Sequence, residues 1–82
     1  MAKHPASQLT ILQWNICGLH LKQEEVRHLL NLHSADVALI QETLLKPEKS
    51  LFFPGFQKFR MDCLDNPGGG VLLLVKNSLS AH

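Results

Sequence analysis

Apolar and polar residues follow two different periods along this chain, and each period predicts a type of secondary structure. Residues 9–14 are β-prone and apolar on both sides, which is typical of a strand covered on both faces of its sheet. From about Lys22 to His33 the apolar residues are spaced three and four apart, which predicts an amphipathic helix. A second strand is predicted from Val37 to about Gln41 or Glu42. A strand, a helix and a strand in so short a span imply parallel pairing through a right-handed crossover.

The second half of the chain predicts a β-hairpin. Phe56 to Met61 alternates between apolar and polar residues, as a half-exposed strand does. The turn sequence Asn66–Gly70 follows, and Val71 to Val75 then predicts a buried strand antiparallel to the one before it. We expect the four phenylalanines to lie in the core (Phe52, Phe53, Phe56 and Phe59). The predicted fold class is therefore α/β.

Length and composition allow one small domain. The chain has 82 residues, of which 45% are hydrophobic and 18% charged, a globular composition. We assign residues 1–8 to an N-terminal tail and residues 9–82 to the domain. The net charge of +1 excludes a strong field that would draw the whole chain to nucleic acid or membrane. The longest apolar run, Val71–Val75, is too short to span a bilayer, and no targeting signal is visible. Cys17 and Cys63 are too few for a disulfide scaffold, and we expect both to be reduced, in or near the core of an intracellular protein.

Two side chains at the ends of the predicted parallel strands form the first candidate site. Asn15 follows the first strand and Glu42 ends the second, and ligands of α/β sheets gather at such strand ends. An amide and a carboxylate side by side would offer oxygen atoms to a hard divalent cation such as Mg²⁺. The competing interpretation is a turn residue beside a solvated strand end, because one carboxylate is a weak metal signal.

Other candidate groups have simpler explanations. Cys17, His20, His28 and His33 loosely resemble a zinc-binding set, but their spacing fits no common zinc finger. We interpret His28 and His33 as helix-end or surface residues. Gly68–Gly70 lacks the Lys-Ser/Thr pair of a phosphate-binding loop, and the hairpin turn explains these glycines better.

The residues around Asn15 and Glu42 resemble two motifs of the endonuclease/exonuclease/phosphatase superfamily. Gln13–Leu19 is similar to the first motif, and Leu39–Thr43 contains the Gln-Glu-Thr of the second. Further segments are similar in order and spacing (Pro54–Phe56, Arg60–Asp62 and Gly68–Lys76). The triple glycine before an apolar strand is especially similar to the endonuclease domains of non-LTR retrotransposons, which are relatives of apurinic/apyrimidinic endonucleases. The resemblance runs from about Leu9 to Leu79.

This resemblance implies roles for four residues. Glu42 would be a metal ligand, and Asn15 would help to position the metal and a phosphate, with one divalent ion, Mg²⁺, as the cofactor. The metal would polarise the scissile phosphodiester and stabilise charge on the leaving oxygen. The loop Gly18–Lys22 would face DNA, with Lys22 and His20 as nucleic-acid contacts. Ordinary solvation of Lys22 is the competing interpretation, and a nuclear location is implied by the same resemblance.

The chain departs from the family pattern in two respects. The family also uses a tyrosine, an Asp-x-Asn pair and a late Asp-His pair; none of these can be placed here, and the sequence contains no tyrosine. Cys17 occupies a place where repair-type members often carry an acidic residue, and a cysteine cannot supply the same oxygen. We therefore expect the N-terminal half of a two-sheet α/β sandwich, an incomplete domain whose exposed sheet face promotes self-association.

The resulting functional expectation has two branches. The first is a truncated metal-dependent phosphodiesterase, by resemblance a DNA-nicking retrotransposon endonuclease, that is inactive alone. The second is a noncatalytic fragment that binds nucleic acid or protein, or a pseudogene product. Mg²⁺-dependent cleavage that is lost on Glu42→Ala would indicate the first branch, and salt-sensitive binding without turnover would indicate the second. Phosphatase members share the first two motifs, so the assignment of DNA as the substrate depends on the resemblance of the segment Gly68–Lys76.

Overall fold

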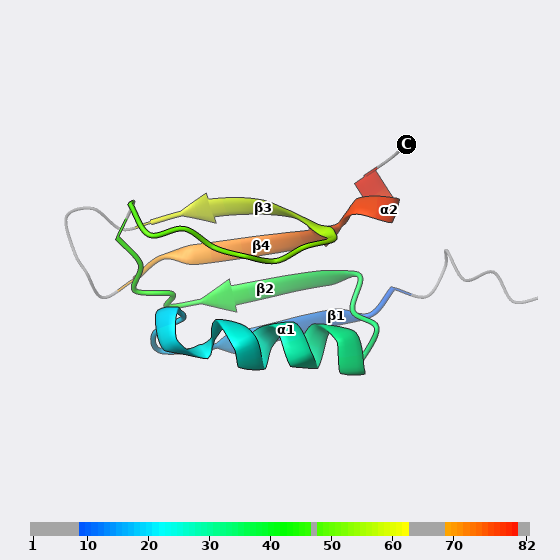
Figure 1. The fold of residues 1–82 in the computed structure, drawn as a ribbon, viewed down its shortest axis with the longest axis horizontal. Coiled ribbons are helices and arrows are strands. Elements are labelled where there is room, and N and C mark those ends of the chain that lie inside the picture. Colours follow the sequence, from blue (N-terminus) through cyan, green and yellow to red (C-terminus); the bar gives the residue numbers. More distant parts are fainter. Residues whose placement is uncertain (1–8, 47, 63–68, 81–82) are drawn as a thin grey trace, which may run out of the picture.

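The computed structural model describes residues 9–46, 48–62 and 69–80, which form a four-stranded sheet with a helix packed on it (Figure 1). The elements, in chain order, are β1 (Ile11–Asn15), the 3-10 helix η2 (His20–Lys22), α1 (Gln23–Leu32), β2 (Val37–Gln41), β3 (Phe56–Met61), β4 (Val71–Lys76) and the short helix α2 (Asn77–Ser80). The predicted helix and the four predicted strands are all present, which confirms the α/β class.

The sheet is mixed, with the strand order β1-β2-β4-β3. β1 and β2 pair in parallel, with Ile11 opposite Val37, which confirms the predicted crossover through α1. β4 is antiparallel to both β2 and β3, so the predicted antiparallel pairing of the last two strands is confirmed as well. The first residues of the predicted turn, 66–68, lie outside the described residues, and Gly69 and Gly70 lead into β4.

β1 differs from its prediction in two ways: it lies at the edge of the sheet, and no described element covers one of its two faces. In the described part of the chain its only strand neighbour is β2, and the Ile11 side chain is 61% exposed. The expectation of a strand covered on both faces is therefore wrong. Leu12 and Trp14 pack against the core, whereas Ile11 points to the other face. A short apolar run does not by itself distinguish an edge strand from a central one.

Local sequence features account for the start of α1, for its buried side and for its end. Acidic residues stand in its first turn, where negative charge stabilises the helix dipole. Val26 and Leu30, four residues apart, are its buried side chains. After the helix the backbone becomes left-handed at Ser34 (φ 50°), and Ala35 N donates to Leu30 O across 2.9 Å. No helix within the described ranges combines the length and the apolar character needed to cross a membrane.

One face of the sheet carries the core. α1 and the segment 42–55 both lie against this face (Figure 1). The sheet contributes Ala38 and Ile40 from β2 and Leu72 and Leu74 from β4, none of them more than 2% exposed. The helix and the loops supply the other buried apolar side chains (Ile16, Leu19, Val26, Leu30, Ala35, Leu45, Leu51 and Phe53). Removing this apolar area from water is the main force that holds the segments on the sheet.

The opposite face carries apolar side chains that no described element covers. Side chains alternate along a strand, so the neighbours of the buried residues point to this other face. We call it the uncovered sheet face, and the strand register assigns these apolar residues to it: Ile11, Val37, Leu39, Phe59, Met61, Val71, Leu73 and Val75. Phe59 is 53% exposed and Met61 is 75% exposed.

The phenylalanines divide between core and surface. Phe53 is buried and Phe56 packs against the core, as predicted. Phe52 and Phe59 are 66% and 53% exposed, so the core prediction is wrong for both. Phe59 lies on the uncovered sheet face, and the ring centroid of Phe52 lies 5.5 Å from the guanidinium carbon of Arg27 on α1. Spacing alone could not separate them, because all four rings lie in or beside an alternating segment.

Candidate active site

The parallel strands β1 and β2 end on the same side of the sheet, at the carboxyl ends of the strands, which we call the Glu42 edge. The loops that follow the two strands remain paired. Ile16 N donates to Gln41 O across 3.0 Å, and Gly18 N donates to Glu42 O across 2.9 Å. These hydrogen bonds extend the parallel ladder beyond the regular strands. They place the residues that follow β1 beside those that follow β2, in a fixed register.

The residues after β2 are also bound on their other side. Thr43 N donates to Gly70 O across 3.3 Å, and Leu44 N donates to Gly69 O across 2.9 Å. Gly70 has a φ of 105°, and a Cβ atom there would collide with the Thr43 hydroxyl, so this position requires glycine. The Gln-Glu-Thr segment is therefore held between the loop after β1 and the glycines before β4.

Three polar side chains converge at this edge. Asn15 Nδ2 donates to Glu42 Oε2 across 3.2 Å. The Cys17 thiol donates to Glu42 Oε1 across 3.3 Å and lies 3.6 Å from Asn15 Oδ1. Asn15 and Cys17 are exposed, and Glu42 is half-buried. The fold thus brings together Asn15, Cys17 and Glu42 in one cluster. The roles of Asn15 and Glu42 in metal binding and catalysis stay predictions.

Two members of this cluster have an unusual backbone conformation. Cys17 (φ 51°) and Glu42 (φ 55°) both lie in the left-handed region, which costs a non-glycine residue about 1–2 kcal/mol. The hydrogen bonds between the two loops hold them there. Backbone strain of this kind is concentrated at functional sites, where the placement of side chains takes precedence over stability.

Cys17 is exposed and not in the core, so that prediction is wrong for this residue, and Cys63 lies outside the described residues. The hydrogen bond to Glu42 and the charge of its carboxylate raise the pKa of the Cys17 thiol; desolvation adds to the rise, and Lys22 opposes it. The thiol is therefore protonated at neutral pH. It acts as a hydrogen-bond donor that orients the Glu42 carboxylate.

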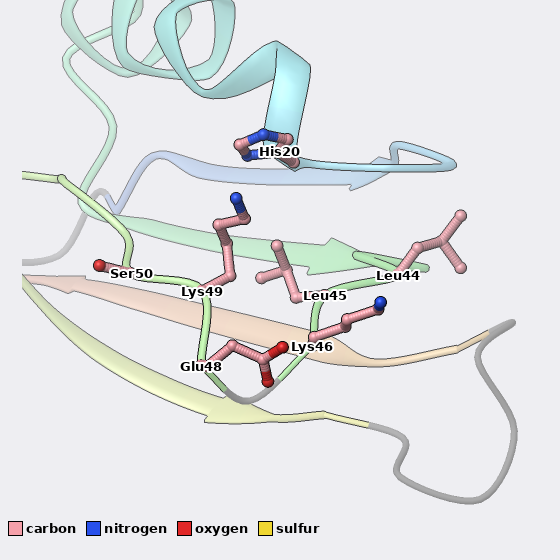
Figure 2. A pocket seen from close by; sticks show the side chains of 7 residues that line it. All are labelled: His20, Leu44, Leu45, Lys46, Glu48, Lys49 and Ser50. Carbon is pink, nitrogen blue, oxygen red and sulfur yellow. The ribbon is translucent and has the colours of Figure 1, made fainter.

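The two predicted nucleic-acid contacts have different surroundings. Lys22 Nζ donates to Ile16 O across 2.9 Å, so its amine ties η2 to the loop that carries Cys17. His20 faces the segment 44–50 across an open groove of about 560 Å³ (Figure 2). Both side chains are exposed, and contact with nucleic acid stays a prediction for each.

No zinc site is formed in the part of the chain that the structure describes. Nowhere within residues 9–46, 48–62 and 69–80 do three or more His, Cys, Asp or Glu side chains lie close enough to hold a metal ion together. His28 on α1 and His33 just after it are exposed, which confirms their interpretation as surface residues.

The donor atoms at the sheet edge suit a hard divalent cation. The Glu42 carboxylate and the Asn15 amide oxygen are ligands of the type that Mg²⁺ prefers. Mg²⁺ commonly takes one or two carboxylates from a protein and its other ligands from water and phosphate. Thiol sulfur is a poor ligand for it, so Cys17 fits the role of a neighbour that orients Glu42. The residues present therefore fit a magnesium ion that is held partly by its substrate.

Cys17 and two lysines of the segment 44–50 are candidate residues that sequence reasoning did not place. The available signal was the position of Cys17 in the first motif, two residues after Asn15 and at a place where repair-type members often carry an acidic residue. Lys46 and Lys49 stand on either side of a proline in the sequence, and nothing local to them indicates that they line a groove together with His20.

Residues 12–82 match the Endonuclease/Exonuclease/phosphatase family. This chain belongs to that family. Among its relatives, the RNA-directed DNA polymerase from the mobile element jockey of Drosophila funebris is 31% identical over 68 residues. The probable RNA-directed DNA polymerase from the transposon X-element of Drosophila melanogaster is 35% identical over 74 residues. The alignments cover 82% and 88% of this chain, but the chain spans only 7% and 8% of those relatives.

Three solved structures show how this endonuclease/exonuclease/phosphatase chain relates to larger proteins. The AP endonuclease LMAP from Leishmania major has a TM-score of 0.77 at 24% identity, over 93% of this chain and 26% of its own. The 3′ phosphatase NExo from Neisseria, bound to a product DNA hairpin, has a TM-score of 0.69 at 23% identity, over 83% and 27%. The catalytic domain of APE2 from Xenopus laevis has a TM-score of 0.64 at 25% identity, over 83% and 23%. The mixed sheet thus corresponds to part of an AP-endonuclease-like α/β fold, as expected.

Proposed function

We propose that this chain carries the metal-binding edge of a metal-dependent phosphodiesterase that nicks DNA, as the endonuclease of a retrotransposon does. The observation that carries the proposal is the 3.2 Å contact between Asn15 and Glu42, where the parallel strands β1 and β2 end. The family match over residues 12–82 and the mobile-element relatives support it.

In this proposal Glu42 is the metal ligand, and Asn15 positions the metal and the scissile phosphate. A bound Mg²⁺ would polarise the phosphodiester and stabilise the charge that develops on the leaving oxygen. Asn15 contacts one carboxylate oxygen of Glu42, and the Cys17 thiol contacts the other. The carboxylate is therefore oriented before any ligand arrives, which lowers the entropy lost on binding.

DNA is the substrate that the comparisons favour. Two relatives are RNA-directed DNA polymerases of mobile elements, and the phosphatase NExo was solved with a DNA hairpin. We infer that DNA is the substrate of the domain to which this chain contributes. We infer an intracellular, nuclear location on the same ground, because chromosomal DNA lies there.

We expect the 82-residue chain by itself to be inactive or barely active. Among the described residues, no histidine or aspartate forms a hydrogen bond with Asn15 or Glu42, so no such side chain is placed to activate an attacking water. The sheet corresponds to about a quarter of the solved chains. We propose that the water-activating groups come from a part of the domain outside these 82 residues.

Metal binding and plasmid nicking, measured together, test the proposal. The wild type is compared with Glu42→Ala and with Glu24→Ala, which removes an exposed carboxylate on α1. Mn²⁺, a paramagnetic substitute for Mg²⁺, should bind to the wild type and to Glu24→Ala but not to Glu42→Ala. Equal Mn²⁺ binding by all three proteins contradicts the proposal. Nicking that is lost only in Glu42→Ala would support it and would show that the chain is active alone.

The same measurements identify the alternative function. A noncatalytic fragment would bind DNA in a salt-sensitive manner, without Glu42-dependent metal binding and without turnover. That combination would replace the proposal by the second branch, a nucleic-acid-binding remnant of an endonuclease domain.

We also propose that the chain associates with a second copy of itself through the uncovered sheet face. The apolar residues of that face include Phe59 and Met61, both more than half exposed. Contiguous apolar surface of this kind is typical of an interaction site.

A further inference from the structure

We propose that the groove between η2 and residues 44–46 and 48–50 binds the sugar–phosphate backbone of the DNA strand that passes the Glu42 edge. We call it the basic groove. The inference rests on the proposed function, because it takes DNA as the substrate. It adds a second contact region, beyond the metal-binding edge, and it assigns that region to Lys46 and Lys49.

The basic groove begins directly beside the candidate active site. Its lining starts at Leu44, two residues after Glu42, and continues to Ser50, with His20 on the opposite side. Figure 2 shows Lys49 reaching toward His20 and Lys46 extended along the same segment. The open volume is about 560 Å³, within the usual range for ligand sites. A DNA strand bound at Glu42 would therefore reach this groove within a short distance along its own backbone.

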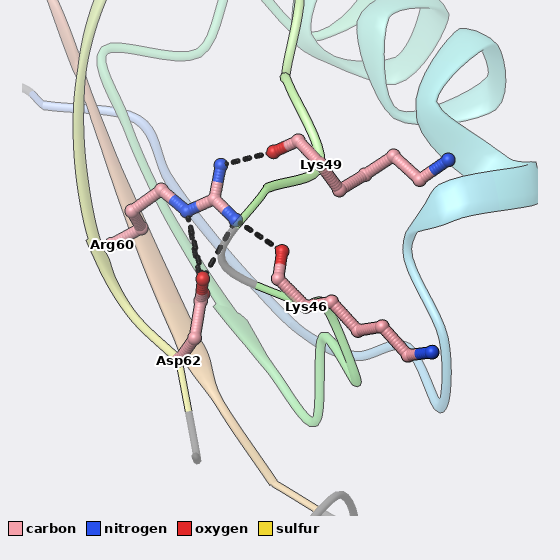
Figure 3. Close-up of polar contacts among 4 residues, drawn as sticks. All are labelled: Lys46, Lys49, Arg60 and Asp62. Atoms are coloured by element: carbon pink, nitrogen blue, oxygen red, sulfur yellow. Dashed lines mark hydrogen bonds and ion pairs between the residues drawn. The ribbon is translucent and has the colours of Figure 1, made fainter.

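Arg60 of β3 fixes the segment that carries both lysines. Its guanidinium donates to Lys49 O across 2.6 Å and to Lys46 O across 3.1 Å. Its Nη2 also forms an ion pair with Asp62 Oδ2 at 2.7 Å. Figure 3 shows the two lysine side chains running away from this guanidinium while their carbonyls face it. The charge of Arg60 is thus neutralised by Asp62, and its contacts hold the lysines toward the groove.

The amines of Lys46 and Lys49 are available for a ligand. Among the described residues, neither forms a hydrogen bond or an ion pair, whereas Lys22 and Lys58 donate to backbone carbonyls. Glu48 is the carboxylate that lines the groove, so two positive charges face one negative charge there. Unpaired lysines in a concave surface attract phosphate by charge, independently of base sequence.

Binding of duplex DNA in EDTA, where no metal-dependent cleavage occurs, tests the basic groove. Affinity is measured by fluorescence anisotropy at several salt concentrations for the wild type, Lys46→Gln and Lys49→Gln. Each substitution should weaken binding and reduce the slope of log K against log salt by about 0.9, the value for one lost phosphate contact. Lys76→Gln is the matched control, because Lys76 ends β4 at the opposite edge of the sheet and should leave the slope unchanged.

Removing a negative charge from the same groove should have the opposite effect on DNA affinity, which strengthens the test. Glu48→Gln removes the carboxylate from the groove lining and should tighten DNA binding by about two- to fivefold. The basic groove is overturned if Lys46→Gln and Lys49→Gln leave the salt slope unchanged, or if Lys76→Gln reduces it equally. Binding of RNA of the same sequence, without binding of DNA, would overturn the choice of DNA.

These outcomes are separate from those of the proposed function. If Lys46→Gln and Lys49→Gln leave the salt slope unchanged while Mn²⁺ binding still depends on Glu42, the proposal for the groove is wrong and the proposal for the metal-binding edge stands. If both lysine substitutions reduce the salt slope but Mn²⁺ binding does not depend on Glu42, the proposal for the groove stands and the phosphodiesterase function is wrong. Circular dichroism of each variant checks that the substitution leaves the fold in place.

Discussion

Cys17 is the residue whose position most changes the chemistry expected at the sheet edge. Its thiol donates to the same carboxylate that we propose as the metal ligand, at 3.3 Å. In this pair the thiol is a neutral donor, because its hydrogen bond to Glu42, and then the negative charge of that carboxylate, raise the pKa of the thiol. A cysteine can therefore occupy this position without competing for a hard cation as a thiolate.

The raised pKa of Cys17 predicts slow reaction with alkylating reagents. The thiolate is the reactive form, so a raised pKa lowers the reactive fraction at every pH below it. Glu42→Gln removes the charge that contributes to this shift and should lower the pKa, which speeds alkylation by iodoacetamide at mildly alkaline pH. The rates are measured in a Cys63→Ser background, so that one thiol reacts.

Glu24→Gln serves as the control for this prediction, because it removes an equal charge from the exposed face of α1. It should leave the alkylation rate and its pH profile unchanged. Equal rates for the wild type and Glu42→Gln across the pH profile would show that Glu42 does not control the thiol.

At the scale of elements, the segment 44–55 is held on the sheet by side chains from its neighbours. Gln23 Oε1 on α1 accepts from Phe52 N at 3.1 Å, and Arg27 donates to Phe52 O across 2.8 Å. Lys58 on β3 donates to Leu51 O across 2.9 Å. These contacts satisfy backbone groups that have no strand partner, which allows an irregular segment to pack against a core.

Arg60 makes the most contacts of this kind. We therefore expect Arg60→Ala to lower the stability of the protein measurably. The substitution frees two backbone carbonyls and leaves the Asp62 carboxylate, which is 8% exposed, without its partner. The free energy of unfolding should fall by about 2–3 kcal/mol in urea titrations. Limited proteolysis should also cut within residues 44–50 sooner than in the wild type.

Arg60→Lys is the matched variant, since it keeps the charge but loses the forked donors. We expect a smaller loss of stability than for Arg60→Ala. Unchanged stability and unchanged proteolysis in Arg60→Ala would mean that the segment is held by its apolar residues alone.

At the scale of the whole molecule, the sheet has a core on one side only. α1 and residues 42–46 and 48–55 cover one face (Figure 1). The strand register places apolar side chains of all four strands on the uncovered sheet face. The superposed part makes up 26% of the LMAP chain and 23% of the APE2 chain. A one-sided sheet of this size gains free energy by covering that face.

Self-association through this face should be visible in sedimentation velocity. We expect the wild type to shift to faster-sedimenting species as its concentration rises, and Phe59→Lys to reduce that shift. Leu32→Lys is the control, because Leu32 is 62% exposed on α1, on the covered side of the sheet. A monomeric wild type at all concentrations, or an equal effect of Leu32→Lys, would contradict this interface.

Much of the fold could be predicted because its elements have local causes. The spacing of Val26 and Leu30 defines α1, and the strand before it and the strand after it imply a parallel pair. The same logic placed Asn15 and Glu42 at neighbouring strand ends, and the structure puts their side chains 3.2 Å apart. Local pattern could not show that β1 is an edge strand, because that depends on which strand lies beside it.

By itself, then, the sequence determined the order and type of α1 and the four strands, the parallel crossover and the family to which the chain belongs, whereas the short helices η2 and α2 were not predicted. Only the tertiary structure decided that Cys17 contacts Glu42, that Phe59 lies on an uncovered face, and that Lys46 and Lys49 line one groove with His20. The physical reason is range. Periodicity and turn chemistry act between residues a few positions apart, whereas burial and side-chain partners depend on segments that folding brings together from distant parts of the chain.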